Sequence, residues 1–147
     1  MGQDRNREIY RALVYELLNW RDAQRELKAL IKARYCGWGV LRLHGVKVFS
    51  AKGRQQYLAQ LPAEEERKMM QRLNAQFDHA IRQWKETLKE VERIGAAFWE
   101  VGEFQRIPGV GPITPHVFSA IIEEPGALRQ QTQALEIQPA GDHRSQQ

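Results

Sequence analysis

The chain has 147 residues, of which 42% are hydrophobic and 27% are charged, a composition that supports a folded core and excludes broad disorder. Lys and Arg outnumber Asp and Glu by 22 to 18, so the charge permits a polyanionic partner. Cys36 is the only cysteine, which excludes an intrachain disulfide, and no stretch is apolar enough for a signal peptide or a membrane span. These features predict a soluble, cytoplasmic protein without a membrane partner.

The first predicted element is a long helix from Asp4 to Arg34. Its apolar residues recur at heptad spacing, with the polar Gln24 at one skipped position. Most intervening residues are charged or polar, which is typical of a solvated helix face. The seam of this helix contains Leu13, Leu17, Trp20, Leu27 and Ile31.

Residues 35–51 break the helical period and form a small irregular insertion. Gly37, Gly39 and Gly45 punctuate this segment, and its apolar residues partly alternate. The pattern fits a short β-hairpin or an ordered loop. A short helix from Arg54 to Leu61 is expected to follow and to end near Pro62.

A second long helix is predicted from Ala63 to Val101. Three glutamates, residues 64–66, lie in its first turn, where they favour the helix dipole. Gly95 is a point at which this helix could divide. Two heptad seams in so short a chain predict an antiparallel coiled-coil hairpin, a homodimer, or both. The second seam contains Met70, Leu73, Phe77, Ile81, Trp84, Leu88, Val91, Ile94, Phe98 and Val101.

The segment Ile107-Pro108-Gly109-Val110-Gly111-Pro112 joins two short apolar runs and predicts a helix-hairpin-helix over residues 102–124. Its glycines permit a tight turn and the close approach of another backbone. The next helix then begins with unpaired N–H groups that can bind a phosphate. We therefore expect DNA-backbone contacts from the amides of Gly109, Val110, Gly111 and Ile113, supported by Arg106. An ordinary loop between packed helices is the alternative.

Other patterns in the chain predict no chemistry. The four histidines share no ligand spacing, so we expect neither a metal site nor a cofactor in this chain. No Ser/His/Asp arrangement is present, and no catalytic residue is predicted. Residues 125–147 are rich in glutamine and are interpreted as a disordered tail. Five basic residues crowd the second half of the first helix and either face a phosphate backbone or form a solvated face: Arg21, Arg25, Lys28, Lys32 and Arg34.

Four stretches together resemble the DEDD insertion-sequence transposases, relatives of the pilin-gene invertase. These are RDAQRELKALIKAR (21–34), WGVLRL (38–43), YLAQLP (57–62) and FQRIPGVGPITPHVFSAII (104–122), and the resemblance extends over about residues 4–125. It implies a coiled-coil region at 4–101, followed by the start of the family's C-terminal transposase domain. The expected fold is thus all-α, with long antiparallel helices, an irregular insertion and a helix-hairpin-helix.

The resemblance implies DNA transposition, with this chain as the DNA-binding and dimerising portion of the enzyme in a bacterial, nucleoid-associated setting. In the full-length family, carboxylates bind divalent metal, a serine forms the covalent DNA link, and in some relatives a structured RNA guides target choice. None of those catalytic residues can be placed on this chain, and Pro115 stands where a small residue is usual. Codons for residues 129–145 can be chosen so that a shifted reading frame resembles the family's continuation. We hypothesise a truncated or frameshifted transposase fragment.

Two other interpretations stay open. One is a non-catalytic helix-hairpin-helix adaptor or repair accessory protein that binds DNA through backbone amides. The other is a purely structural coiled-coil protein, in which the glycine turn is only a connector.

Overall fold

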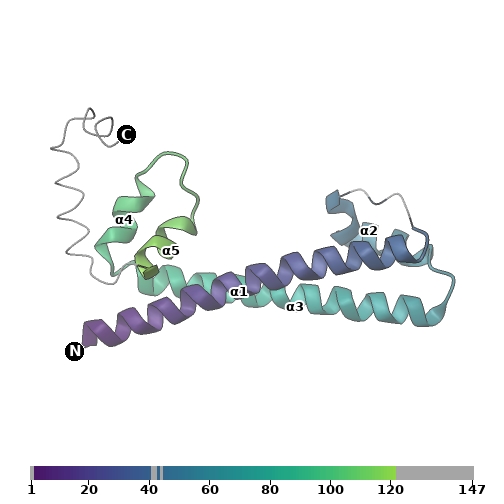
Figure 1. Cartoon of the computed structure of the whole chain (residues 1–147), viewed down its shortest axis with the longest axis horizontal. Coiled ribbons are helices and arrows are strands. Elements are labelled where there is room, and N and C mark those ends of the chain that lie inside the picture. The colour runs from purple at the N-terminus through teal and green to yellow at the C-terminus, as the bar shows by residue number, and fades with distance from the viewer. Residues whose placement is uncertain (1, 41–42, 44, 122–147) are drawn as a thin grey trace, which may run out of the picture. The chain divides into compact units, whose positions relative to one another are not determined.

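The computed structural model describes residues 2–40, 43 and 45–121. Regular structure within these ranges is entirely helical, which confirms the all-α prediction (Figure 1). The chain forms two compact units: residues 15–89 make one, and residues 2–14 with residues 90–121 belong to the other. The first turns of the N-terminal helix therefore share a unit with the predicted helix-hairpin-helix. The predicted tail, residues 125–147, and the acidic pair Glu123 and Glu124 lie outside the described residues.

Helix α1 spans Gly2–Gly37, a little longer at both ends than predicted. It ends in a Schellman motif, in which two backbone N–H groups reach back to the last carbonyls of the helix. The Val40 N–H donates to the Tyr35 carbonyl at 2.9 Å, and the Gly39 N–H donates to the Cys36 carbonyl at 3.1 Å. Gly39 has a φ of +89°, which favours glycine at the residue that reverses the chain.

Helix α3 spans Glu64–Gly95 and packs antiparallel to α1 (Figure 1). The contacts of residues 15–89 fix this direction. Near the middle of α1, the Trp20 ring lies 5.7 Å from the His79 ring. At the C-terminal end of α1, Ile31 and Tyr35 share a core with Met70, near the start of α3. The predicted antiparallel pair of long helices is confirmed.

The buried face of each long helix differs in part from the predicted seam. On α1, the predicted Leu17 and Ile31 are fully buried, whereas Leu13, Trp20 and Leu27 are half-buried. Tyr10, Val14 and Tyr35 take the buried positions beside them. The heptad row that joins Val14 to Tyr35 passes through Arg21 and Lys28, so a search for apolar residues misses it. On α3 the buried side chains are Met70, Asn74, Phe77, Ala80, Thr87 and Val91.

The segment between the long helices is helical in much of its described part, so the predicted β-hairpin does not form there. It contains the 3-10 helix η1 (Gly45–Phe49) and helix α2 (Ala51–Ala59). The Ser50 side chain caps α2 by accepting a hydrogen bond from the Gly53 N–H at 3.0 Å. Val48 and Tyr57 bring the insertion into the core of this unit.

The predicted continuation of the second helix to Val101 is wrong, because α3 ends at Gly95. A Cβ at Gly95 would lie 2.7 Å from Nδ1 of His116 and 3.0 Å from the Tyr10 ring. Glycine thus admits the His116 ring at the end of the helix. A new helix, α4, spans Trp99–Gln105, and after a loop α5 spans Thr114–Ile121. These two short helices pack against each other, with the Phe104 and Phe118 rings 5.4 Å apart.

Candidate nucleic-acid interface

The loop between α4 and α5 contains a tight turn that its sequence explains. Residues 107–110 read Ile-Pro-Gly-Val, and the Val110 N–H donates to the Ile107 carbonyl at 3.3 Å. Gly109 has a φ of +83°. Proline followed by a glycine of positive φ is the residue pair of a type II turn. The sequence thus dictates a rigid bend, and all residues from Gln105 to Gly109 are exposed.

Among the described residues, no other backbone makes the expected close approach to the two glycines. A Cβ added at Gly109 or at Gly111 would meet no atom within 4 Å. Gly109 is required by its backbone angle, whereas Gly111 has no positive φ. Space beside both residues is open to a partner.

The four predicted amide donors differ in their hydrogen bonding. Among the described residues, the N–H groups of Gly109, Gly111 and Ile113 have no acceptor, while the Val110 N–H is engaged in the turn. At the start of α5, the N–H groups of His116 and Val117 both donate to the Ile113 carbonyl. Pro115 has no N–H to offer. The donors that face solvent therefore belong to the loop more than to the first turn of the helix.

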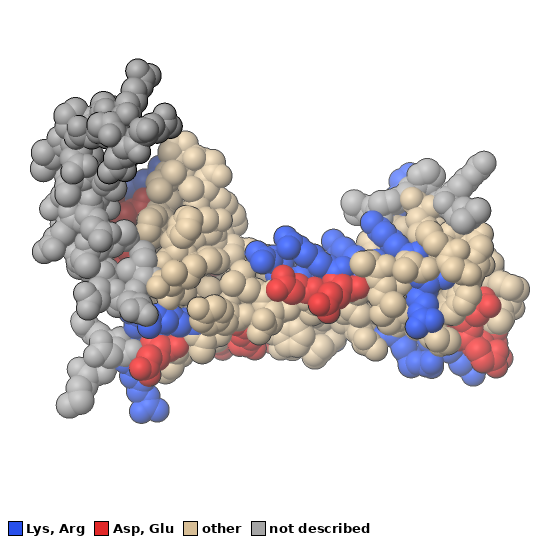
Figure 2. Space-filling view, viewed as in Figure 1, with Lys and Arg blue, Asp and Glu red and all other residues tan. Residues whose placement is uncertain are grey.

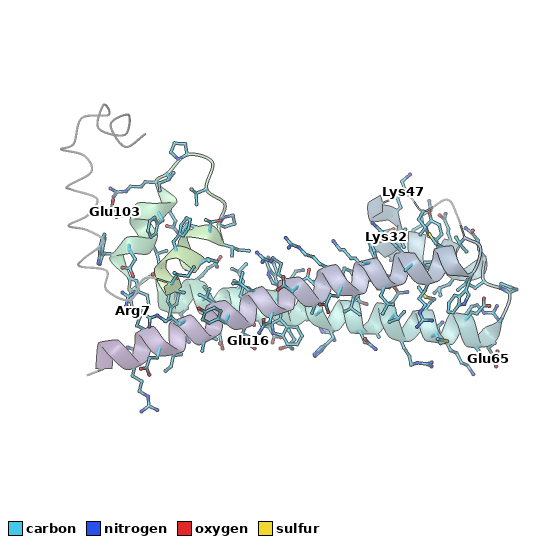
Figure 3. The ribbon with its side chains drawn as sticks, viewed as in Figure 1. Arg7, Glu16, Lys32, Lys47, Glu65 and Glu103 are labelled. Carbon is cyan, nitrogen blue, oxygen red and sulfur yellow. The ribbon has the colours of Figure 1, made fainter. Side chains whose placement is uncertain are left out.

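Arg106 lies at the C-cap of α4, directly before the turn. Its side chain is 81% exposed and its Nη1 lies 3.7 Å from Oε1 of Glu103 (labelled in Figure 3). An exposed pair at this separation holds the guanidinium weakly. Arg106 is thus placed on the same loop as the predicted amides and can exchange its carboxylate partner for a phosphate.

A buried polar cluster holds the two hairpin helices to the first turns of α1. The Glu100 carboxylate accepts hydrogen bonds from Nη1 of Arg7 and, at 2.8 Å, from the Ser119 hydroxyl. Glu100 and Ser119 are both fully buried. Nε of Arg11 donates to the Ala120 carbonyl at 2.8 Å, a further link to α5. Arg7 points from α1 toward these helices (Figure 3).

The pKa of the Glu100 carboxyl reflects two opposing effects. Burial raises the pKa, but the hydrogen bonds from Arg7, from the backbone and from Ser119 together lower it by more, so the net shift is downward. The carboxylate is therefore charged at neutral pH although it is enclosed. Its charge is matched by Arg7, so the cluster is an ion pair that fixes the hairpin rather than a reactive centre.

A second buried contact joins α5 to α1 beside Gly95. The Tyr10 hydroxyl lies 2.7 Å from Nδ1 of His116, and the two groups share a hydrogen bond. Burial lowers the pKa of the His116 imidazole and raises the pKa of the Tyr10 hydroxyl. Both groups are therefore neutral at pH 7. His116 and Ser119 act in packing here, and the sequence offered no signal for either cluster because Arg7 and Tyr10 lie 93 and 106 positions from their partners Glu100 and His116.

The positive charge of the chain is concentrated in the unit of residues 15–89. Residues 15–89 carry fifteen Lys and Arg against eight Asp and Glu, whereas residues 2–14 and 90–121 together carry five against six. Figure 2 shows Lys and Arg side chains along α1 toward α2. Long-range attraction of a polyanion thus falls on the unit of residues 15–89.

Within the described residues, no group of three or more His, Cys, Asp or Glu side chains is placed to hold a metal ion. Among those same residues, no helix is long and apolar enough to cross a membrane. A search of family models, of curated proteins and of solved structures found no match to this chain.

Proposed function

We propose that this chain is the DNA-binding and dimerising portion of an insertion-sequence transposase and that it binds the DNA backbone without reading bases. The observation that carries the proposal is the exposed turn at residues 106–113. It combines unpartnered amides at Gly109, Gly111 and Ile113 with an exposed arginine. Amides and arginine on a rigid loop suit phosphate oxygens, which are alike in every sequence. The resemblance of residues 4–125 to the transposase family supports the same role.

The coiled-coil region is proposed to pair two copies of the chain. A groove between α1 and α3 is lined by three alanines and Leu27, together with Trp20, Gln76 and His79; the alanines are Ala23, Ala75 and Ala80. Small residues allow a helix of a second copy to approach closely. A solution mass of twice 17.1 kDa would support this pairing, and a monomer at all concentrations would exclude it.

Gly111→Glu tests the hairpin contact directly. Gly111 has open space around it and no positive φ, so the new carboxylate should leave the fold intact and repel phosphate. We expect affinity for a generic duplex to fall about tenfold, which corresponds to about 1.4 kcal/mol.

Gly102→Glu is the matched control for this substitution. Gly102 is exposed on α4 in the same unit, and a Cβ there also meets no atom within 4 Å. The control adds the same charge on α4 instead of in the turn and should change affinity much less. Equal losses in the two variants would show that the hairpin makes no specific contact with DNA.

A further inference from the structure

The second half of α1 carries a row of basic side chains that the hairpin proposal does not use. Four of them follow the spacing 4-3-4 along the helix, so at 100° per residue they fall within one narrow arc. No Asp or Glu lies in that arc, although Asp22 on the neighbouring face forms an exposed ion pair of 3.6 Å with Arg21. We call this row the basic stripe: Arg21, Arg25, Lys28 and Lys32.

The stripe ends at a groove of about 500 Å³ between α1, α2 and α3. Lys28 and Lys32 both line it, and so do the rings of Phe49 and Phe77. Nζ of Lys28 lies 5.7 Å from the centroid of the Phe49 ring and 5.8 Å from that of Phe77. Nζ of Lys32 lies 5.8 Å from the Phe49 centroid. The aromatic rings thus hold both ammonium groups at the groove.

The acidic side chain of this groove is already neutralised. Arg54 donates two hydrogen bonds of 2.7 Å to the two carboxylate oxygens of Asp78. These bonds lower the pKa of the Asp78 carboxyl, which stays charged and paired. Lys28 and Lys32 form no ion pair with any described carboxylate. The two lysines therefore keep their charge for an external anion (Lys32 is labelled in Figure 3).

We propose that the basic stripe and its groove bind the phosphate backbone of duplex DNA and supply most of the electrostatic affinity of this chain. Cations one helical turn apart on a straight helix match a run of phosphates along one strand. A lipid surface would be met better by a flat basic face with exposed apolar side chains, and here the rings lie inside a groove. The inference rests on the proposed DNA binding and adds a second surface, on the unit of residues 15–89.

The test uses the full chain and a labelled 20-base-pair duplex, with affinity measured over a series of salt concentrations. Lys28→Gln/Lys32→Gln should weaken binding at least tenfold at low salt. Because each lost phosphate contact lowers the slope of log K against log salt by about 0.9, the slope should fall by about 1.8. Lys28→Arg/Lys32→Arg keeps the charge and should restore both values.

Arg34→Gln/Arg72→Gln is the matched control. Both arginines are exposed, belong to the same unit and project away from the stripe, so this variant loses the same charge elsewhere. Equal losses in the stripe and control variants would overturn the stripe as a site. A stripe loss seen with a structured RNA or with anionic vesicles, but not with the duplex, would overturn DNA as its occupant.

The outcome also separates this inference from the proposed function. If the unaltered chain binds duplex without salt dependence, the proposed DNA function fails. If the unaltered chain binds with a steep slope that only Gly111→Glu reduces, the hairpin contact stands and the stripe is refuted.

Discussion

Gly53 is the residue at which the fold tolerates substitution least. A Cβ at this position would lie 1.5 Å from the carbonyl oxygen of Lys47, far inside any allowed contact. The obstacle is backbone, so no side-chain rotation can relieve it. We expect Gly53→Ala to lower the free energy of unfolding, measured by urea denaturation, by about 1–3 kcal/mol.

Gly37→Ala provides the control for this prediction, since it adds the same methyl group within the same unit. Gly37 is the last residue of α1, and a Cβ there meets nothing within 4 Å. Alanine in place of a helical glycine should be neutral or should stabilise by up to about 1 kcal/mol. Equal behaviour of the two variants would show that the packing of α2 against η1 is wrong.

At the residue scale, the sequence predicts roles that depend on local geometry. The turn at Pro108 and Gly109 follows from the conformational preferences of those two residues, and the structure contains it. Glu100 is different, because its charged partner Arg7 lies on α1, 93 positions away along the chain. A buried glutamate inside an amphipathic run looks like a solvated one until the tertiary contacts are known.

At the scale of elements, the cluster around Glu100 makes the hairpin unit sensitive to acid. The folded pKa of Glu100 is lowered, so its contribution to stability is present above the unfolded value of about 4.3 and is lost as the pH falls through the folded pKa. The folded pKa of His116 is also lowered, so stability is lost as the pH falls below about 6.5. The His116 titration therefore predicts a decline in unfolding free energy as the pH falls below about 6.5, and the Glu100 titration predicts a further decline below about pH 4.3.

Glu100→Gln should remove the part of this pH dependence that lies below about pH 4.3 and should destabilise the unit at pH 7. Loss of one partner of a buried pair leaves Arg7 uncompensated, at a typical cost of about 3–5 kcal/mol. Glu103→Gln on the same helix breaks only an exposed pair with Arg106 and should change stability little. Thermal unfolding at several pH values checks both, and an unchanged acid profile in Glu100→Gln would contradict the assignment.

The long helices were predictable because heptad spacing and capping are local signals. The residues at which these helices end, and the faces that they bury, were less predictable. A Cβ at Gly95 would meet the His116 ring, and a search for apolar residues misses the heptad row from Val14 to Tyr35 because it passes through Arg21 and Lys28. The sequence already singled out these two residues in a crowded basic set, but only the structure places Lys28 beside the groove at Phe49 and Phe77.

At the scale of the whole molecule, charge and hairpin belong to different units. Residues 15–89 hold a surplus of cations, and the exposed glycine turn belongs to the nearly neutral unit. We infer that attraction and positioning are divided: the stripe supplies the electrostatic affinity and the turn adds short-range contacts with phosphate oxygens. A purely structural coiled-coil protein would need neither the basic stripe nor the exposed glycine turn.

The salt dependence of DNA binding by the unaltered chain tests this account most directly. With at least three phosphates neutralised, log K should fall against log salt with a slope of about −2.7 or steeper on a generic duplex of any sequence. A slope near zero, or no binding at low salt, would contradict phosphate contact altogether and would leave the chain as a structural coiled-coil protein.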